Sequence, residues 1–238
     1  MAGHNKWSQI KHKKAKEDSK RGKAFTKLIK EITVAARTGG GHPDSNAHLR
    51  MLLDKAKEIN MPQENATKAI KRGTGELPGV NYEEFTYEGF GPHGIGVIIE
   101  TLSDNKNRTV ADLRHIFSSK GGNLGEGGSV SWMFEKMGII RATAKQVTED
   151  ELFEKLLEFD IKDIQHDGTF FSIFCDPKEL DIVKEAVKNA GLHIESAELE
   201  WVAKTTTTLN EKDSAHALDF LSTLQDHDDV KNVYTNLT

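Results

Sequence analysis

The 238-residue chain has little cysteine, proline and aromatic content, and it has no long apolar run. A single cysteine, Cys175, excludes an intrachain disulfide and any cysteine-rich zinc site. It follows the apolar run 170–174, which predicts a buried strand thiol. No segment reaches the apolar length of a membrane span, and no apolar core follows the early positive charges as a secretory signal requires. We therefore expect a soluble, cytoplasmic protein.

The residue spacings of catalytic and metal sites are also missing. The ten histidines are scattered, without a His-Glu-x-x-His or similar ligand spacing. No serine lies in the context of a nucleophile elbow. The acidic residues of 149–154 follow the surface positions of a helix. We predict no catalytic residues, no metal ligands, no cofactor and no small-molecule substrate, and we do not expect an enzyme.

Charge is present in quantity and is unevenly distributed. Residues 1–75 hold 17 Lys and Arg against 7 Asp and Glu, a balance of +10, and the remaining chain holds 15 against 30, a balance of −15. The segment 6–37, here called the basic leader, holds eleven Lys and Arg opposed by three acids. Such a density of like charge repels itself, and a polyanion would relieve the repulsion and release counterions on binding. The alternative is a solvated lysine-rich tail that balances an acidic body.

The basic leader is the predicted nucleic-acid contact. Its cations would lie on phosphates, which sets affinity without reading base sequence. Trp7 has two interpretations, stacking on an unpaired base or ordinary packing beside a helix. The predicted contact residues of the leader are Lys6, Trp7, Lys11, Lys13, Lys14, Lys16, Arg21, Lys23, Lys27, Lys30 and Arg37.

A second candidate contact is the run 104–108, between a predicted strand and a predicted helix. Asp104, Asn105 or Asn107 can cap that helix. Lys106 and Arg108 are cations at the positive end of a helix dipole, which favours an anionic partner. The alternative is a pair of solvated charges on an ordinary loop.

The glycine-rich run 121–128 invites comparison with phosphate-binding loops. Those loops follow a strand and open a helix, whereas this run follows a predicted helix and precedes a predicted strand. A flexible loop is the better interpretation.

Apolar periodicity predicts the secondary structure. Three amphipathic helices are expected before residue 75: one through Phe25–Ala36, one capped by Ser45, and one opened by Pro62. Strands are expected at 85–89, 95–102 and 130–134, with a helix over 110–117. The later order is strand 139–144, helix 152–157, hairpin 161–175, helix 177–187 and strand 194–201, the split β-α-β-β-α-β unit. A strand 205–209, a helix 217–224 and a strand 230–236 close the chain.

These elements predict an α+β protein with a discontinuous middle domain. The closing strand, helix and strand have no partners of their own, so we expect them to complete the sheet of 85–134. The predicted domains are a basic helical nucleic-acid-binding domain (1–78), a discontinuous α+β domain (79–136 plus 204–238) and an inserted ferredoxin-like domain (137–203).

The sequence resembles the YebC/PmpR family, related to the mitochondrial translational activator of cytochrome c oxidase subunit I. The motifs that carry the resemblance are Met1–His4, Lys6-Trp7, Ile10–His12, Lys20–Lys23, Phe25–Ile29, Glu31–Arg37, Asn60–Pro62, Ala69–Gly73, Tyr87–Gly89, Asp104–Thr109, Gly121–Gly125 and Gly128–Val130. They cover essentially the whole chain. The departures are Ser8-Gln9 where the family pattern has Ala-Asn, and Asn46-Ala47-His48 where it has Asn-Pro-Arg.

The resemblance implies a crescent of three domains, a helical N-terminal domain and two ferredoxin-like α+β domains, one inserted in the other. It implies a DNA-binding transcriptional regulator and not an enzyme. Relatives are also described as translation factors that relieve ribosome stalling at proline runs, so binding to ribosomal RNA is the alternative. A third hypothesis is a protein-interaction adaptor that uses the acidic domains, and the density of charge in the leader argues against it.

Overall fold

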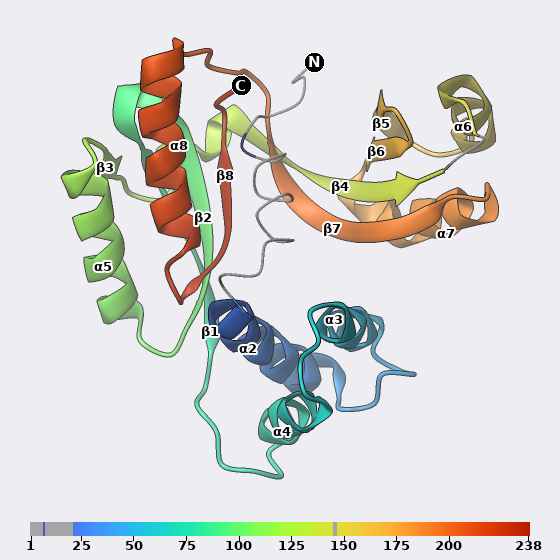
Figure 1. The fold of residues 1–238 in the computed structure, drawn as a ribbon, viewed down its shortest axis with the longest axis horizontal. Coiled ribbons are helices and arrows are strands. Elements are labelled where there is room, and N and C mark those ends of the chain that lie inside the picture. Colours follow the sequence, from blue (N-terminus) through green and yellow to red (C-terminus); the bar gives the residue numbers. More distant parts are fainter. Residues whose placement is uncertain (1–6, 8–20, 145–146) are drawn as a thin grey trace. The chain divides into compact units, whose positions relative to one another are not determined.

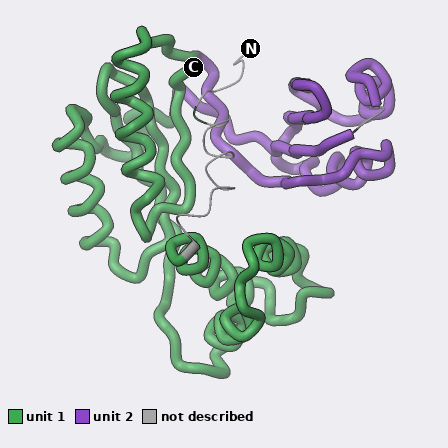
Figure 2. The backbone as a smooth tube through the Cα atoms, in the orientation of Figure 1, with its two compact units in different colours: residues 1–132, 206–238 green, residues 133–205 purple. Residues whose placement is uncertain are grey.

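The computed structural model describes residues 7, 21–144 and 147–238. Contacts between Cα atoms divide the chain into two compact units, residues 1–132 with 206–238, and residues 133–205 (Figure 2). The helices before residue 75 therefore group with the first sheet, and the second sheet forms the other unit. None of the helices in the described part is long and apolar enough to cross a membrane.

The helical region of the first unit consists of α2 (Arg21–Gly39), α3 (Ala47–Glu58) and α4 (Gln63–Gly73) (Figure 1). Their apolar faces meet in one cluster that includes Leu28, Ile32, Leu49 and Ala69. Asn46 caps α3, because its side chain accepts the Leu49 amide at 3.0 Å, whereas the Ser45 hydroxyl donates to the carbonyl of His42. The prediction that Ser45 caps this helix was wrong by one residue.

The first sheet has the order β3-β1-β2-β8, with all neighbours antiparallel. Its elements are β1 (Glu83–Phe90), the short helix η2 (Pro92–Gly94), β2 (Gly96–Ser103), α5 (Lys106–Ser119), β3 (Asn123–Leu124), α8 (Glu211–Gln225) and β8 (Val230–Thr235). Helices α5 and α8 pack on the sheet, and the rings of Phe117 and Phe220 meet edge to face with centroids 4.9 Å apart.

The second unit is the predicted split β-α-β-β-α-β arrangement. Its elements are β4 (Phe134–Thr143), α6 (Glu149–Leu156), β5 (Ile161–Asp167), β6 (Phe170–Cys175), the short helix η4 (Pro177–Glu179), α7 (Leu180–Asn189) and β7 (His193–Ala203). The sheet order is β5-β6-β4-β7, antiparallel throughout. Cys175 is fully buried in its core, where burial raises the pKa of the thiol to about 11, so the prediction of a buried strand thiol is confirmed.

Two predicted strands are absent from the described residues. Residues 131–133 form the short helix η3 (Ser131–Met133), and β4 begins at Phe134 and runs without a break to Thr143. The predicted strand 205–209 is reduced to a single bridge between Thr207 and Leu237. The fourth strand of the first sheet is instead the two-residue β3, which lies in the glycine-rich run.

Candidate nucleic-acid interface

Five of the leader's eleven predicted contacts lie outside the described residues. These are Lys6, Lys11, Lys13, Lys14 and Lys16. Arg21 begins α2, and its side chain is likewise outside what the structure describes. The remaining predicted contacts are Trp7 and four cations of α2, together with Lys106 and Arg108.

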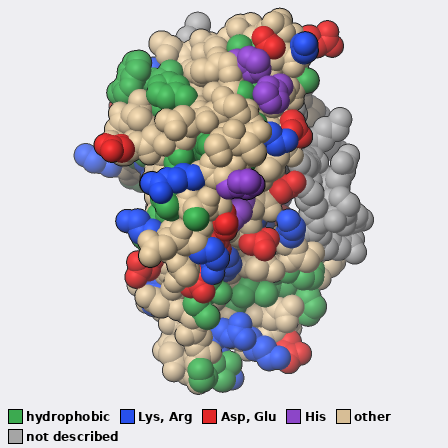
Figure 3. Space-filling model, turned by 90° about the vertical axis from the view of Figure 1, so that its left-hand side faces the viewer, with side chains coloured by type: hydrophobic (Ala, Val, Ile, Leu, Met, Phe, Trp, Pro, Cys, Tyr) green, Lys and Arg blue, Asp and Glu red, His purple; other side chains and the backbone are tan. Residues whose placement is uncertain are grey.

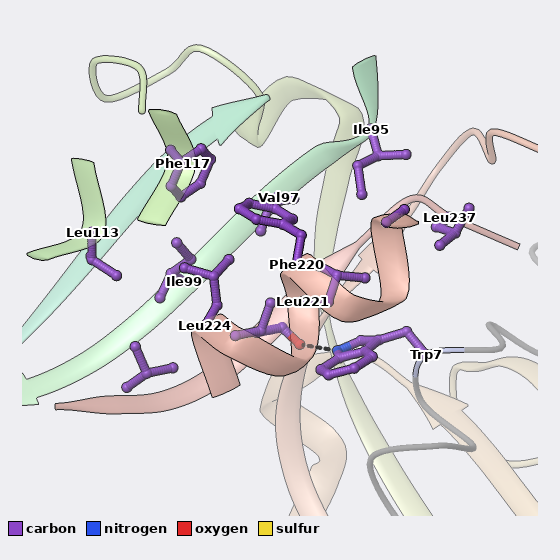
Figure 4. Close-up of a cluster of buried hydrophobic side chains, with 13 residues drawn as sticks. Trp7, Ile95, Val97, Ile99, Leu113, Phe117, Phe220, Leu221, Leu224 and Leu237 are labelled. Carbon is purple, nitrogen blue, oxygen red and sulfur yellow. Dashed lines mark hydrogen bonds between the residues drawn. The ribbon is translucent and has the colours of Figure 1, made fainter. Parts of the chain in front are cut away.

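Trp7 is part of the hydrophobic core of the first unit. Only 3% of the residue is exposed, and it packs in a cluster with Phe220, Leu221 and Leu237 (Figure 4). Its indole Nε1 donates to the carbonyl oxygen of Val233, on β8, at 3.0 Å. The indole is therefore not open to a nucleic-acid base. Of the two interpretations of Trp7, packing is the one that the structure shows, and the prediction that Trp7 stacks on a base is wrong.

Three lysines of α2 bind the carboxyl end of α8 and the turn that follows it. Lys23 donates to the carbonyl of Asp226 at 3.1 Å, Lys27 to that of Gln225, and Lys30 to that of Asp228 at 3.1 Å. The positions 23, 27 and 30 recur at helical spacing, so the three side chains leave α2 on one side. The last carbonyls of a helix carry partial negative charge and have no partner within the helix. Lys23 and Lys27 supply such partners, and together with Lys30, which binds the turn after the helix, they are here called the lysine comb.

Burial lowers the pKa of Lys27 to about 8, although the nearby carboxylates of Asp226, Asp228 and Glu31 act in the opposite direction. The ammonium group is thus less strongly protonated than an exposed lysine. Lys27 is a poor candidate for a phosphate contact chiefly because its Nζ already donates to the carbonyl of Gln225.

The carboxylate of Asp229 is the partner of Lys30 and gathers three other donors. Lys30 Nζ lies 2.7 Å from Oδ1, and Arg108 Nη2 (2.8 Å), Thr109 Oγ1 (2.8 Å) and Ser103 Oγ (3.1 Å) lie near Oδ2. The side chain of Asp229 is 3% exposed and that of Lys30 is 10% exposed. Burial by itself would raise the pKa of Asp229, but the hydrogen bonds from Arg108, Lys30 and Thr109 hold it well below its usual range. This cluster joins α2, the end of β2, the start of α5 and the turn before β8.

The position of Arg108 at a helix amino terminus is explained within the chain. Its guanidinium bridges Asp104 at 2.7 Å and Asp229 at 2.8 Å, and these hydrogen bonds raise its pKa. Asn105 is the residue that caps α5, by accepting the amide of Arg108. Lys106 is exposed, with its ammonium 5.4 Å from the centre of the Phe85 ring. The position of Arg108 at the positive end of the helix dipole suggested an external anion. Two carboxylates of the protein instead compensate its charge.

Arg37 is exposed and holds the segment that follows the helical region. Its guanidinium donates to the side chain of Asn81 and to the carbonyl of Tyr82.

Further exposed cations lie on α3 and α4: Arg50, Lys55, Lys57, Lys68, Lys71 and Arg72. On the face of the molecule shown in Figure 3, Lys and Arg side chains are interspersed with Asp and Glu. The described surface of this face therefore carries no broad patch of positive charge.

The last residue of the glycine-rich run and two residues after it donate their amides to a carboxylate of the protein. The buried carboxylate of Glu88 accepts the amides of Gly128 (3.0 Å), Val130 (2.9 Å) and Ser131 (2.8 Å). Burial opposes ionisation of Glu88, and the backbone hydrogen bonds lower its pKa on balance. An internal anion thus already binds these three amides. The same bonds explain why residues 130–134 do not form the predicted strand, since two of their amides are committed to Glu88.

Sequence reasoning missed Asp229 and Glu88, which organise these contacts. Asp229 lies 199 positions from Lys30, within the acidic run 226–229, and nothing in that run marks one carboxylate as buried. Glu88 lies in the motif Tyr87–Gly89, and nothing in the sequence distinguishes it from Glu83 and Glu84 of the same strand.

The chain matches known proteins over its whole length. Residues 5–76 match the family description "TACO1/YebC protein N-terminal domain" and residues 82–237 match "TACO1/YebC second and third domain". The chain belongs to the TACO1/YebC family. Its relatives include a "probable transcriptional regulatory protein" of Desulfatibacillum aliphaticivorans, 52% identical over 99% of this chain and 96% of the relative. One of Persephonella marina is 52% identical over 99% and 95%.

A solved structure has the same fold. The crystal structure of a conserved hypothetical protein from Aquifex aeolicus matches with a TM-score of 0.85 at 44% identity, covering 98% of this chain and 96% of that one. The YebC resemblance read from the motifs and the α+β fold are therefore confirmed. Within residues 7, 21–144 and 147–238, no three His, Cys, Asp or Glu side chains come together as a metal site.

Proposed function

We propose that the protein is a nucleic-acid-binding regulator of gene expression, a DNA-binding transcriptional regulator in the cytoplasm whose contact is the upstream part of the basic leader. The supporting observation is the division of the leader's cations. Lys23, Lys27 and Lys30 bind carbonyls at the end of α8 and in the turn after it. The upstream part of the leader, from Lys6 to Lys20, holds six further lysines and is the part of the chain with the highest density of positive charge. The names of the relatives, probable transcriptional regulatory proteins, support the same function.

The proposed mechanism is electrostatic. Lysines of the leader lie on phosphates and release counterions, which gives affinity that depends on salt and does not depend on base sequence. Lys106 and the exposed part of Arg108 are the remaining candidates for weaker backbone contacts. The acidic remainder of the chain as a whole is repelled by the polyanion, because like charges repel, so contacts outside the leader are confined to a few residues. The proposal includes no catalytic step and no cofactor.

The test separates DNA from the ribosome. The leader variant replaces Lys11, Lys13 and Lys14 by Ala, and a matched variant replaces Lys162, Lys178 and Lys188, three exposed lysines of the second unit. At physiological salt we expect the wild type and the matched variant to shift duplex DNA in a gel, and the leader variant to lose the shift. Protein that sediments with purified ribosomes and does not shift duplex DNA would replace this proposal by the ribosome alternative. Binding of neither would contradict both.

A further inference from the structure

Trp132 is the most exposed large hydrophobic side chain in the described part of the chain. Two-thirds of it, 67%, is accessible to solvent, whereas Trp7 is 3% exposed. Tryptophan is large and mostly apolar, so exposure on this scale leaves a large apolar area in water. Isolated exposed apolar residues are common, and this one needs a further observation to give it meaning.

The further observation is that hydrogen bonds to β1 hold the segment that carries Trp132. The carboxylate of Glu88 holds the amides of Gly128, Val130 and Ser131, and the carbonyl of Glu88 accepts the amide of Gly125 at 2.8 Å. The backbone on the amino side of Trp132 is thus fixed to β1 by four hydrogen bonds. Bonds to an ionised carboxylate are among the strong ones.

The indole itself is also oriented. Its Nε1 donates to the carbonyl of Ser129 at 3.1 Å, within the same segment. The ring is therefore held in one direction by a hydrogen bond and a braced backbone, without being buried. An aromatic ring held in place loses little conformational entropy when a partner covers it, which is the condition for an efficient contact.

The space before the segment is open. A Cβ atom added at Gly127 or at Gly128 would meet no atom within 4 Å. The tip of the segment thus has open space beside its backbone at these two positions. The only charged side chain between Gly125 and Trp132 is Glu126, so the segment itself has no cation to hold a phosphate.

These features suit a ligand with a flat face. The indole N–H is already used, and a ring that is two-thirds exposed offers an aromatic face as its remaining interaction. Nucleic-acid bases stack on such faces, and the contact tolerates any base because every base has a flat face. Resting on the proposed function, we propose that Trp132 is a second, uncharged nucleic-acid contact that stacks on an unpaired base.

This contact complements the leader. The lysines bind phosphates of any strand, paired or not, whereas bases in a duplex are stacked on each other and their faces are closed. Trp132 therefore adds affinity only where the bound nucleic acid contains unpaired bases. The two contacts are separable by choosing the nucleic acid.

The test compares Trp132→Ala with the wild type on a 20-nucleotide single strand of dA and on a blunt duplex of the same length. We expect Trp132→Ala to bind the single strand about tenfold more weakly, as for one lost stacking contact, and the duplex equally well. Trp132→Phe, which keeps an aromatic face, should recover part of the loss. Phe153→Ala is the matched control, because Phe153 is an exposed aromatic residue of the second unit, 53% accessible.

Equal binding of the single strand by Trp132→Ala and the wild type would overturn this inference and leave the proposed function standing. Equal losses on single strand and duplex would also overturn it, since stacking requires an open base. If the wild type binds neither nucleic acid, the proposed function fails and the inference fails with it. The side chain of Trp132 is exposed, so thermal unfolding of Trp132→Ala should match the wild type and confirm that the variant is folded.

Discussion

At the scale of the residue, Asp229 has the largest consequence for stability. Its buried carboxylate accepts hydrogen bonds from Lys30, Arg108, Thr109 and Ser103. Two of these donors are cations that the sequence assigned to nucleic acid. The pairing shows why a count of cations overstates a binding surface: a lysine that neutralises a buried aspartate is part of the fold.

Removing this charge should destabilise the first unit. We predict that Asp229→Asn lowers the free energy of unfolding by about 3–5 kcal/mol at neutral pH, because it leaves Lys30 buried without its counter-charge. Urea unfolding measures the difference. Asp228→Asn is the matched control, since Asp228 is exposed and should cost less than about 0.5 kcal/mol. Equal costs for the two variants would contradict the account.

The same carboxylate gives a pH dependence. Its pKa is lowered in the folded state, so its contribution to stability is fully present above the unfolded pKa of about 3.9 and declines as the pH falls toward the folded pKa. The stability difference between the wild type and Asp229→Asn should therefore shrink below about pH 4, by up to about 1.4 kcal/mol per pH unit. Urea unfolding at pH 5, 3.5 and 2.5 tests this. A difference that is constant across the three values would show that the carboxylate is not held ionised by its donors.

At the scale of the element, the lysine comb connects α2 to the carboxyl end of α8 and to the turn between α8 and β8. The comb is graded in burial, since Lys23 is exposed, Lys27 is intermediate and Lys30 is buried. A hydrogen bond from a charged group contributes more where water is excluded. The attachment of the helical region to the first sheet is thus concentrated at Lys30.

This grading predicts unequal costs along one helix face. Lys30→Ala should lower the free energy of unfolding by about 1.5–3 kcal/mol, because it removes a hydrogen bond to a buried carboxylate. Lys23→Ala, with the same change of charge on the same helix, should stay within about 0.5 kcal/mol of the wild type. Urea unfolding of the two variants measures both. A cost for Lys23→Ala as large as that for Lys30→Ala would show that burial does not set the strength of the comb.

Most elements could be predicted because apolar periodicity is a local property. The helices and the sheet of the second unit follow directly from it, and so does the split β-α-β-β-α-β order. The failures have non-local causes. The local pattern of residues 130–134 predicts a strand. In the structure two of their amides donate instead to Glu88, which lies more than forty positions away in sequence. The comb could not be predicted either, because its lysines and their acceptors lie about 200 positions apart.

At the scale of the whole molecule, the uneven charge is the feature that the sequence reveals best. The first 75 residues carry +10 and the remainder carries −15. The structure refines this picture, since part of the positive charge of α2 neutralises α8 and Asp229. The division into domains 1–78, 79–136 plus 204–238, and 137–203 stays a prediction beside the two observed units.

The measurement that tests the central claim most directly is the salt dependence of binding to duplex DNA. The quantity is the slope of log K against log salt for the wild type, the leader variant and the matched variant of Lys162, Lys178 and Lys188. Each phosphate contact contributes about 0.9 to the slope, so loss of three contacts in the leader variant should reduce its magnitude by about 2.7. The matched variant should keep the wild-type slope. An unchanged slope in the leader variant, or an equal reduction in the matched variant, would contradict the claim that the upstream leader carries the polyanion contact.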